Sequence, residues 1–475
     1  MVFSSLVFLW IFLPIVLLTY YLVDTKFKNY WLLFMSLLFY AWGEPKYIFV
    51  MILSICINYI FGILVDKSMS IKQAKILVFI CVAINLLFLI YFKYTNFIID
   101  NISRLIGSDF QFKQVALPIG ISFYTFQAIS YVIDVYRGKY SELEGVTVQK
   151  NFFNLALYIS LFPQLIAGPI IKYKDVQSQI NSRILSNQKF AYGVRRFCYG
   201  LGKKVLISNT LASTADIIFN LNANQVSASI AWLGIICYAL QIYYDFSGYS
   251  DMAIGLGKMF GFDFMENFNY PYISSSIQEF WRRWHISLST WFREYLYIPL
   301  GGNRKGKTRT YMNLLIVFLA TGIWHGASWN FVVWGLIHGF FIVVERIWLG
   351  KALANNKYKF INRLYTLGVI LISWVFFRAA GLGKAIEYLK NMFMITIAQE
   401  ANSIMLYLDR EVSLTLIVAI LFCGVIQYIK PNIKNYFYDE TITYRAELII
   451  LPIILLACIM YLVSGAYNPF IYFRF

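Results

Sequence analysis

The stretch Tyr311–Gly326, YMNLLIVFLATGIWHG, is an apolar run that ends in a histidine and a glycine. Its apolar part, Tyr311–Trp324, has 14 residues. A helix of that length rises about 21 Å, whereas the hydrocarbon core of a bilayer is about 30 Å thick. We therefore expect a helix that stops inside the membrane and leaves His325 at depth, beside a break that precedes the second apolar run, Phe331–Val344. Ionisable residues within a membrane are costly and usually functional, so His325 is the first candidate for a catalytic residue.

The composition of the whole chain is typical of a membrane protein. Of its 475 residues, 59% are hydrophobic and 14% are charged, whereas about 25% of the residues of a soluble domain are charged. Further apolar runs occur at Ser4–Val23, Asn29–Trp42, Tyr47–Val65, Ile76–Phe92, Ile230–Tyr244, Leu364–Phe377, Ser413–Ile429 and Leu448–Val463. These runs predict an all-α polytopic bundle with about ten or eleven crossings and additional interfacial or re-entrant helices. We expect one integral-membrane domain over residues 1–475.

The net charge of +17 arises from 41 basic and 24 acidic residues. The basic residues stand mostly between apolar runs, where the positive-inside rule and anionic lipid place them. We therefore predict membrane lipid, and not nucleic acid, as a partner. Lysines gather in the first and third loops, which we therefore expect in the cytoplasm, with the N-terminus outside. The first apolar run lacks the features of a cleaved signal peptide and predicts a retained helix.

The six cysteines all lie in apolar sequence, and none forms a Cys-x-x-Cys pair. This pattern is typical of small buried side chains, so we expect neither a disulfide nor a metal site.

Two segments do not fit regular membrane spans. Phe152–Ile171 contains FPQLIAGP at Phe162–Pro169, and two prolines and a glycine this close together interrupt a helix. We expect a broken or re-entrant helix near a cavity, with a kinked span as the alternative. Tyr192–Ile207 carries four basic residues and is too charged to cross, so we expect it to lie along the cytoplasmic interface.

A second histidine lies in Phe280–Tyr295, FWRRWHISLSTWFREY. Ser276 and Glu279 form a capping box that starts one amphipathic helix through this stretch. His285 falls on its aromatic face, where a histidine that simply packs in a core is the more common interpretation. The third histidine, His338, lies between two glycines in the second apolar run and is interpreted as packing.

A turn and a basic loop follow this helix. Gly301 and Gly302 predict a tight turn at Asn303. Basic residues then occupy the loop up to Arg309. They are a topology signal or, alternatively, attract a phosphorylated donor.

The polar patch Tyr244–Asp251, YDFSGYSD, follows another apolar run. Asp245, Ser247 and Tyr249 can line a polar path, although an interfacial helix cap fits equally well. A histidine at depth that is reached by such a path can act as a general base near neutral pH. There is no Gly-x-Ser-x-Gly motif and no cysteine near either histidine, which argues against a covalent hydrolase. Attack of an acceptor hydroxyl on an activated acyl donor suits these residues, and so does a proton relay in a transporter.

Three of these motifs, taken together, indicate a protein family more specifically than the chemistry of the candidate residues does. Trp281–Arg293 (WRRWHISLSTWFR), Tyr297–Arg304 (YIPLGGNR) and Gly322–Gly326 (GIWHG) closely resemble the membrane-bound O-acyltransferase family, in its bacterial branch of alginate and peptidoglycan O-acetyltransferase membrane subunits. Leu117–Gln127 and the patches Phe162–Pro169 and Tyr244–Asp251 are also similar to that branch. The resemblance covers about half of the chain, with a family-like core at about 117–345.

This resemblance implies a fold and a function. The fold is a helical bundle with a central funnel, and the enzyme is an acyltransferase in the bacterial cytoplasmic (inner) membrane. It implies that acetyl is taken from acetyl-CoA, a substrate rather than a tightly bound cofactor, and passed across the membrane. The acceptor side comprises a partner acetyltransferase outside the cytoplasm, of the SGNH-hydrolase type, and a polysaccharide such as alginate or peptidoglycan.

The resemblance also implies which residues take part. His325 matches the central catalytic histidine, and His285 matches the second motif histidine. The candidate substrate-binding residues are Arg283, Trp284, Asn303, Trp324, Asp245, Ser247 and Tyr249.

Other functions are weighed against this one. Related transferases that attach D-alanine to lipoteichoic acid share both histidines, which makes D-alanyl transfer the main alternative. A proton-coupled transporter or a purely structural membrane subunit is a further alternative, and neither needs an acyl donor.

Overall fold

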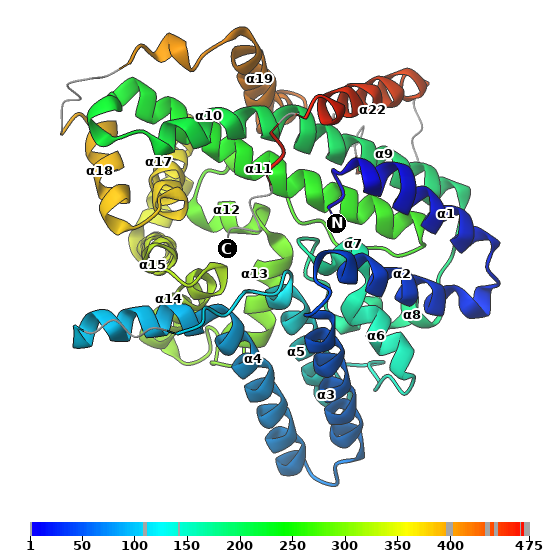
Figure 1. The fold of residues 1–475 in the computed structure, drawn as a ribbon. Helices are drawn as coiled ribbons and strands as arrows, with labels where there is room; N and C mark the ends of the chain where they lie inside the picture. The colour runs from blue at the N-terminus through cyan, green and yellow to red at the C-terminus, as the bar shows by residue number, and fades with distance from the viewer. Residues whose placement is uncertain are drawn as a thin grey trace. The chain divides into compact units, whose positions relative to one another are not determined.

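The computed structural model describes residues 2–107, 112–140, 143–395, 402–432, 438–440, 445–465 and 467–469. Within these ranges the chain is built from helices and contains no strand (Figure 1). The predicted all-α fold class is therefore confirmed. The chain divides into two compact units, of which unit 1 comprises Met1–Val194 and Met252–Met265, and unit 2 comprises Arg195–Asp251 and Glu266–Phe475.

Unit 1 contains the first eight α-helices. Their bounds are α1 Leu13–Leu22, α2 Lys28–Gly43, α3 Ile48–Lys67, α4 Ile71–Ile106, α5 Ile121–Lys139, α6 Phe152–Ser160, α7 Phe162–Leu165 and α8 Tyr173–Asn181, with the π-helix η1 Phe8–Phe12 before α1. The break predicted within Phe152–Ile171 is confirmed, because Leu161, with φ −56° and ψ 113°, leaves the helical conformation between α6 and α7. Residues 161–170 are all buried, so protein covers the interrupted backbone as a membrane requires.

Unit 2 holds the remaining helices and the segment with the three histidines. Its elements include η3 Lys203–Ser208, α10 Asn209–Asn220, α12 Ile277–Arg283, α13 Ile286–Phe292, α14 Gly306–His325, α15 Trp329–Val344, α17 Lys359–Arg378, α18 Leu382–Met392, α19 Arg410–Ile420, η9 Leu421–Val425, α20 Ile426–Ile429 and α22 Glu447–Val463. Two long helices, α9 Asn187–Gly202 and α11 Ala228–Met259, have residues in both units. The core of unit 2 is strongly aromatic and includes Trp281, Trp284, Trp334 and Trp374.

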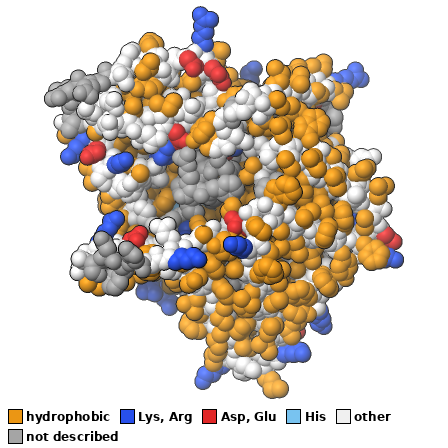
Figure 2. Space-filling view, in the orientation of Figure 1, with side chains coloured by type: hydrophobic (Ala, Val, Ile, Leu, Met, Phe, Trp, Pro, Cys, Tyr) orange, Lys and Arg blue, Asp and Glu red, His pale blue; other side chains and the backbone are white. Residues whose placement is uncertain are grey.

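Among the described helices, five are long and apolar enough to cross a membrane, at 48–67, 71–106, 329–355, 359–378 and 410–429. Two shorter apolar helices lie at Phe8–Leu22 and Glu447–Val463. Hydrophobic side chains cover the exposed surface of the paired helices α3 and α4 (Figures 1 and 2). The fourth expected span, Ile76–Phe92, is too short, because α4 has 36 residues. The total of ten or eleven crossings stays a prediction.

The prediction that the basic segment Tyr192–Ile207 lies along an interface is wrong for its charged side chains. Arg195, Arg196 and Lys204 are all buried. Each forms an ion pair, and the pairs are Arg195–Glu447, Arg196–Asp251 and Lys204–Asp245. A buried charge is tolerated when an opposite charge compensates it, and carboxylates distant in the sequence supply that compensation here.

The helix that leads to the third motif is also longer than expected. α14 begins at Gly306 rather than Tyr311 and has 20 residues, which corresponds to a rise of about 30 Å. Part of the expected basic loop, Lys307 and Arg309, therefore forms its exposed first turn. The added first turn is polar, and α14 is not among the five described helices that are long and apolar enough to cross, so its stopping within the membrane stays a prediction. The prediction that it ends at His325 is confirmed.

Candidate active site

His325 is the last residue of α14, and α15 begins four residues later. The two helices approach closely because glycines face each other. A Cβ on Gly322 would lie 2.3 Å from the carbonyl oxygen of Phe331 and 3.2 Å from the Cα of Gly335. The two helices therefore meet at Gly322 of α14 and Gly335 of α15, whereas Gly326 follows the end of α14. This close packing fixes the position of His325 against α15.

Aromatic rings surround the His325 imidazole. Its ring centroid lies 4.9 Å from that of Trp334 on α15 and 5.2 Å from that of Phe377 on α17, both nearly perpendicular to it. Three different helices thus determine the orientation of this side chain. Its residue exposure is 6%, whereas His285 and His338 have none. This small exposure does not reach the ring nitrogens of His325, because Nδ1 and Nε2 are both buried.

His285 lies at a break between two short helices. The sequence predicts one amphipathic helix through this stretch, and that prediction is wrong: α12 ends at Arg283 and α13 begins at Ile286. His285 has φ 45° and ψ 54°, a left-handed conformation that costs a non-glycine residue about 1–2 kcal/mol. The predicted cap at the start of α12 is confirmed, because Ser276 Oγ accepts a hydrogen bond from the Glu279 amide at 3.0 Å.

Asn267 holds the strained segment in place. Its backbone oxygen accepts a hydrogen bond from the Ile286 amide at 3.0 Å. Its side-chain Oδ1 accepts from Ser287 Oγ at 2.9 Å and lies 3.1 Å from His285 Nδ1. Because Oδ1 can only accept, Nδ1 carries the proton in the neutral ring, and the lone pair of His285 is on Nε2. Asn267 therefore selects the tautomer that can act as a base at Nε2.

Trp324 lies between the two motif histidines. Its ring centroid is 5.0 Å from that of His325 and 6.2 Å from that of His285. The structure therefore brings His285, Trp324 and His325 together, although the two histidines are 40 positions apart in the sequence.

A cavity of about 310 Å³ lies in unit 2 and is lined by residues of the two histidine motifs, although neither His285 nor His325 lines it. Its lining includes three exposed arginines, Arg282, Arg293 and Arg346, and none of the described residues that line it is acidic. Ser289 and Thr321 also line it. Ser289 follows His285 by four residues and Thr321 precedes His325 by four, so each is about one helical turn from a histidine.

Asn303 is at the same cavity, on the confirmed turn with Gly301 and Gly302 in positive-φ conformations. Its Oδ1 accepts a hydrogen bond from the Tyr297 hydroxyl. Arg346 donates to the same hydroxyl at 3.3 Å. The predicted binding residue Asn303 is thus connected to one of the cavity's arginines.

Comparison with known proteins identifies the family of this chain. The family model of the membrane-bound O-acyltransferases matches residues 102–382, more than half of the chain. The chain belongs to the membrane-bound O-acyltransferase family. It is 41% identical to a probable alginate O-acetylase of Pseudomonas putida over all of both chains. It is 37% identical to a peptidoglycan O-acetyltransferase of Helicobacter pylori, over 82% of this chain and 80% of the relative.

More distant members of the family match a shorter part of the chain. A teichoic acid D-alanyltransferase of Streptococcus thermophilus is 31% identical over 50% of this chain and 59% of its own length. The family resemblance, the membrane character and the acyltransferase class expected from the sequence are confirmed.

Several residues predicted to bind substrate in this acyltransferase have structural contacts instead of lining the cavity. Arg283 forms an ion pair with Glu279 at 2.8 Å and donates to the Asn269 carbonyl at 3.1 Å. Trp284 is buried among aromatic rings, including Trp374 at 5.1 Å between centroids. Their roles in binding stay predictions.

The polar patch on α11 is buried in the protein. Asp245 lies 2.5 Å from Lys204 in an ion pair, and Ser247 and Tyr249 are each 2% exposed. Whether this patch lines a path for substrate stays a prediction. His338 is likewise buried, and its Nδ1 accepts a hydrogen bond from Trp281 Nε1 at 3.2 Å, which agrees with its interpretation as packing.

Sequence reasoning missed Asn267 and the arginines of the cavity. Asn267 stands in an irregular loop 18 residues before His285, where no periodicity marks it. Arg282 and Arg293 lie within the quoted motif, and their spacing of 11 residues, about three helical turns, could have indicated a shared side. The break at His285 prevents that inference from a single ideal helix.

The charge state of His285 gives a pH prediction. This residue lies outside the candidate spans, and burial lowers the pKa of its imidazole to about 3. The ring is thus neutral between pH 5 and 8, and we expect no inflection from His285 in the pH profile of acyl transfer. Asn267→Asp places a carboxylate beside Nδ1 and raises this pKa, so its profile should gain an inflection in that range. Transfer rates of both proteins from pH 5 to 8 provide the measurement.

An inflection that is already present in the wild type and moves in Asn267→Asp would contradict the neutral state of His285. Asn267→Gln is the uncharged control, and it should gain no inflection.

Proposed function

We propose that this protein is a membrane O-acetyltransferase that transfers acetyl from acetyl-CoA towards an extracytoplasmic polysaccharide. The single observation that carries this proposal is the arginine-lined cavity, which has no acidic residue among its described lining residues and includes Ser289 and Thr321, each four residues from one of the two motif histidines. The planar guanidinium fork of arginine matches phosphate oxygens, so this cavity suits a donor that carries phosphates. The relatives named as alginate and peptidoglycan O-acetyltransferases support acetyl as the transferred group.

In the proposed reaction, His325 accepts the proton of an acceptor hydroxyl. The hydroxyl oxygen attacks the carbonyl carbon of the thioester, a C–O bond forms and the C–S bond breaks. The proton that His325 accepted then passes to the departing thiolate of coenzyme A, so that the products are an O-acetyl ester and free thiol and the imidazole is neutral again. The lone pair on His285 Nε2 can accept a hydrogen bond from a group that donates a proton near the thioester sulfur.

We further propose that the protein resides in the bacterial inner membrane, with the cavity facing the cytoplasm. The acceptor side comprises a partner acetyltransferase of the SGNH-hydrolase type and a polysaccharide. Lipid is the solvent for the exposed apolar helices.

The test uses inverted membrane vesicles that contain the protein and its acceptor. Labelled acetyl-CoA is added outside, and the label on luminal acceptor is measured against vesicles without the protein. Transfer from acetyl-CoA supports the proposal. Label that comes only from a D-alanyl carrier protein overturns it in favour of D-alanyl transfer, and solute flux without any acyl donor overturns it in favour of transport.

The arginines of the cavity give a second prediction. Arg282→Gln and Arg293→Gln should each raise the KM for acetyl-CoA about tenfold with little change in kcat, because a hydrogen bond to a charged group is worth about 1.5–3 kcal/mol. Steady-state kinetics of the vesicles provide the measurement.

Lys305→Gln is the matched control. This lysine is exposed and does not line the cavity, and its long-range attraction is screened at physiological ionic strength. If Lys305→Gln raises KM as much as the arginine variants do, the donor is attracted by the general positive charge of this region and not by the cavity.

A further inference from the structure

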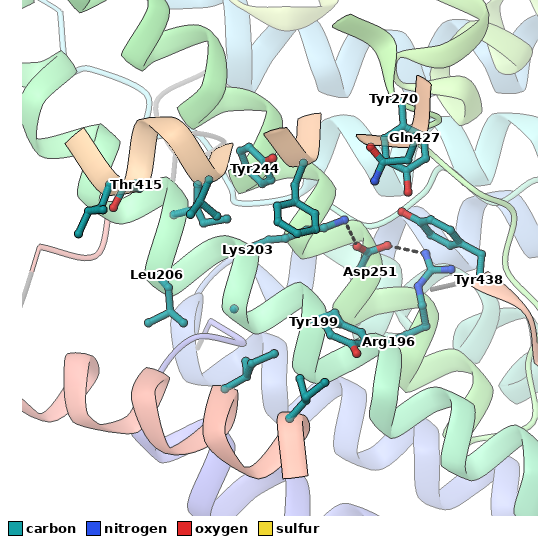
Figure 3. A pocket seen from close by; sticks show the side chains of 17 residues that line it. Arg196, Tyr199, Lys203, Leu206, Tyr244, Asp251, Tyr270, Thr415, Gln427 and Tyr438 are labelled. Carbon is teal, nitrogen blue, oxygen red and sulfur yellow. Dashed lines mark hydrogen bonds and ion pairs between the residues drawn. The ribbon is translucent and has the colours of Figure 1, made fainter. Parts of the chain in front are cut away.

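A second and larger cavity, of about 540 Å³, lies elsewhere in unit 2 (Figure 3). The end of α9 and the π-helix η3 form one wall, and residues of α19, η9, α20 and α22 form the others. This volume lies in the range of about 300–1,000 Å³ that is typical of small-molecule sites. It shares no lining residue with the 310 Å³ cavity, and none of His285, Trp324 and His325 lines it, so the two cavities are distinct.

One end of this cavity is charged but balanced. Asp251 accepts hydrogen bonds from Arg196 and, at 2.6 Å, from Lys203 (Figure 3). Arg196 also donates to Glu266 Oε1 at 2.7 Å. These two cations and two carboxylates sum to a formal charge of zero. A ligand with a net charge of either sign therefore finds no compensating charge in this cluster.

The same end presents a hydrogen-bond acceptor that no described residue uses. Gln427 lines the cavity and is only 7% exposed. Within the described part of the chain, its Oε1 has no hydrogen-bond partner. A buried amide oxygen without a donor costs about 1–3 kcal/mol, which a ligand with an N–H or O–H group would remove.

Tyrosines complete the polar end. Tyr270, which lines the cavity beside Gln427, has φ 48°, a left-handed conformation that is unusual for an aromatic residue. Tyr438 also lines this end of the cavity, with its ring 4.4 Å from the Arg196 guanidinium carbon. The strained backbone at Tyr270 thus coincides with a hydroxyl-bearing side chain that lines this cavity.

The other end of the cavity is apolar and continuous with the lipid-facing surface. Leu414, Val418 and Phe422 line it from the candidate span Arg410–Ile429, and they are 65%, 41% and 40% exposed. Ile450 lines it from the apolar helix α22 and is 37% exposed. Side chains this exposed on an apolar helix of a membrane protein contact hydrocarbon, so a lipid chain can enter between α19 and α22.

We propose that this cavity binds a single zwitterionic phospholipid. One acyl chain lies between α19 and α22, and the headgroup lies at the balanced cluster. The ammonium group donates to Gln427 Oε1, and the phosphate accepts from the Lys203 ammonium and a tyrosine hydroxyl. The zero charge of the cluster favours phosphatidylethanolamine over the anionic phosphatidylglycerol.

The test reconstitutes the full-length protein into nanodiscs of equal parts phosphatidylethanolamine and phosphatidylglycerol. The protein is then released into mild detergent, and retained lipid is measured by native mass spectrometry. One retained phosphatidylethanolamine, about tenfold enriched over phosphatidylglycerol, is the expected result, since a hydrogen bond to a charged group is worth about 1.5–3 kcal/mol. No retained lipid, or phosphatidylglycerol retained equally or better, overturns the proposal.

Two variants locate the site. Val418→Trp fills the apolar end and should abolish retention, whereas Ile417→Trp, on the neighbouring 57%-exposed residue outside the cavity, should leave it unchanged. Equal retention in both tryptophan variants overturns the assignment to this cavity. Gln427→Leu keeps the side-chain volume but removes the acceptor, so the preference between the two lipids should fall to near unity; a preference that remains overturns the assigned headgroup contact.

Discussion

His325→Ala is expected to lower the rate of acetyl transfer by about 10²–10⁴-fold, the usual contribution of a general base. The His325 ring is oriented by Trp334 and Phe377 from two further helices. Removal of the imidazole leaves the arginine-lined cavity intact, so the KM for the donor should change little. The measurement is initial transfer rate in vesicles with matched protein levels.

His325→Gln and His338→Gln separate chemistry from packing. Glutamine at 325 preserves hydrogen-bonding capacity but cannot act as a base near neutral pH, so it should be as inactive as the alanine variant. At 338, the glutamine oxygen can still accept the hydrogen bond from Trp281 Nε1, and activity should stay close to that of the wild type. Wild-type activity in His325→Gln would exclude the proposed base.

Asp251→Asn is expected to destabilise the protein by about 3–5 kcal/mol, because it leaves buried positive charge without its partner. The Asp251 carboxylate accepts from both Arg196 and Lys203, and its side chain is 8% exposed while that of Arg196 is 2% exposed. The measurement is the thermal unfolding of the purified protein in detergent. The midpoint temperature and the unfolded fraction at one chosen temperature are compared between Asp251→Asn and the wild type.

Glu266→Gln is the matched control on the same guanidinium. The Glu266 side chain is 46% exposed, so solvent screens its ion pair with Arg196, and the loss should be at most about 1 kcal/mol. Equal destabilisation by the two variants would show that burial of Asp251 does not determine the effect.

The ionisation of Asp251 also predicts how this contribution depends on pH. Burial alone raises the pKa of its carboxyl, but the ion pairs with Arg196 and Lys203 outweigh burial and hold the pKa below its usual value. A carboxyl with a lowered pKa stabilises the folded state above its unfolded pKa of about 3.9 and loses this contribution as the pH falls further. The difference between wild type and Asp251→Asn should therefore be constant from pH 5 to 8.

Much of the site was accessible from sequence because its residues lie in compact motifs. The position of His325 at a helix end follows from a 14-residue apolar run that is followed directly by His325 and Gly326, and the structure has that end. The start of the same helix was misplaced by five residues, because exposed Lys307 and Arg309 are equally compatible with a loop and with a first turn. Helix ends at a polar boundary have weak local signals.

The interpretation of His285 shows where local pattern fails. Its neighbours have helical periodicity, which predicts an unbroken amphipathic helix. The chain instead breaks there, because Asn267, from a loop 18 residues earlier, binds the Ile286 and Ser287 amides and His285 Nδ1. A contact with a distant loop overrides a preference worth fractions of a kcal/mol per residue.

The sequence by itself determined the all-helical membrane fold, the acyltransferase family and the two motif histidines, since hydrophobic length and short motifs are local properties. Only the tertiary structure decided which charges neutralise one another. Arg196 and Asp251 are 55 residues apart and meet because α9 and α11 pack together there. The cavity arginines and the Asn267 contact likewise depend on how helices pack, and packing is set by the whole core rather than by any single stretch of sequence.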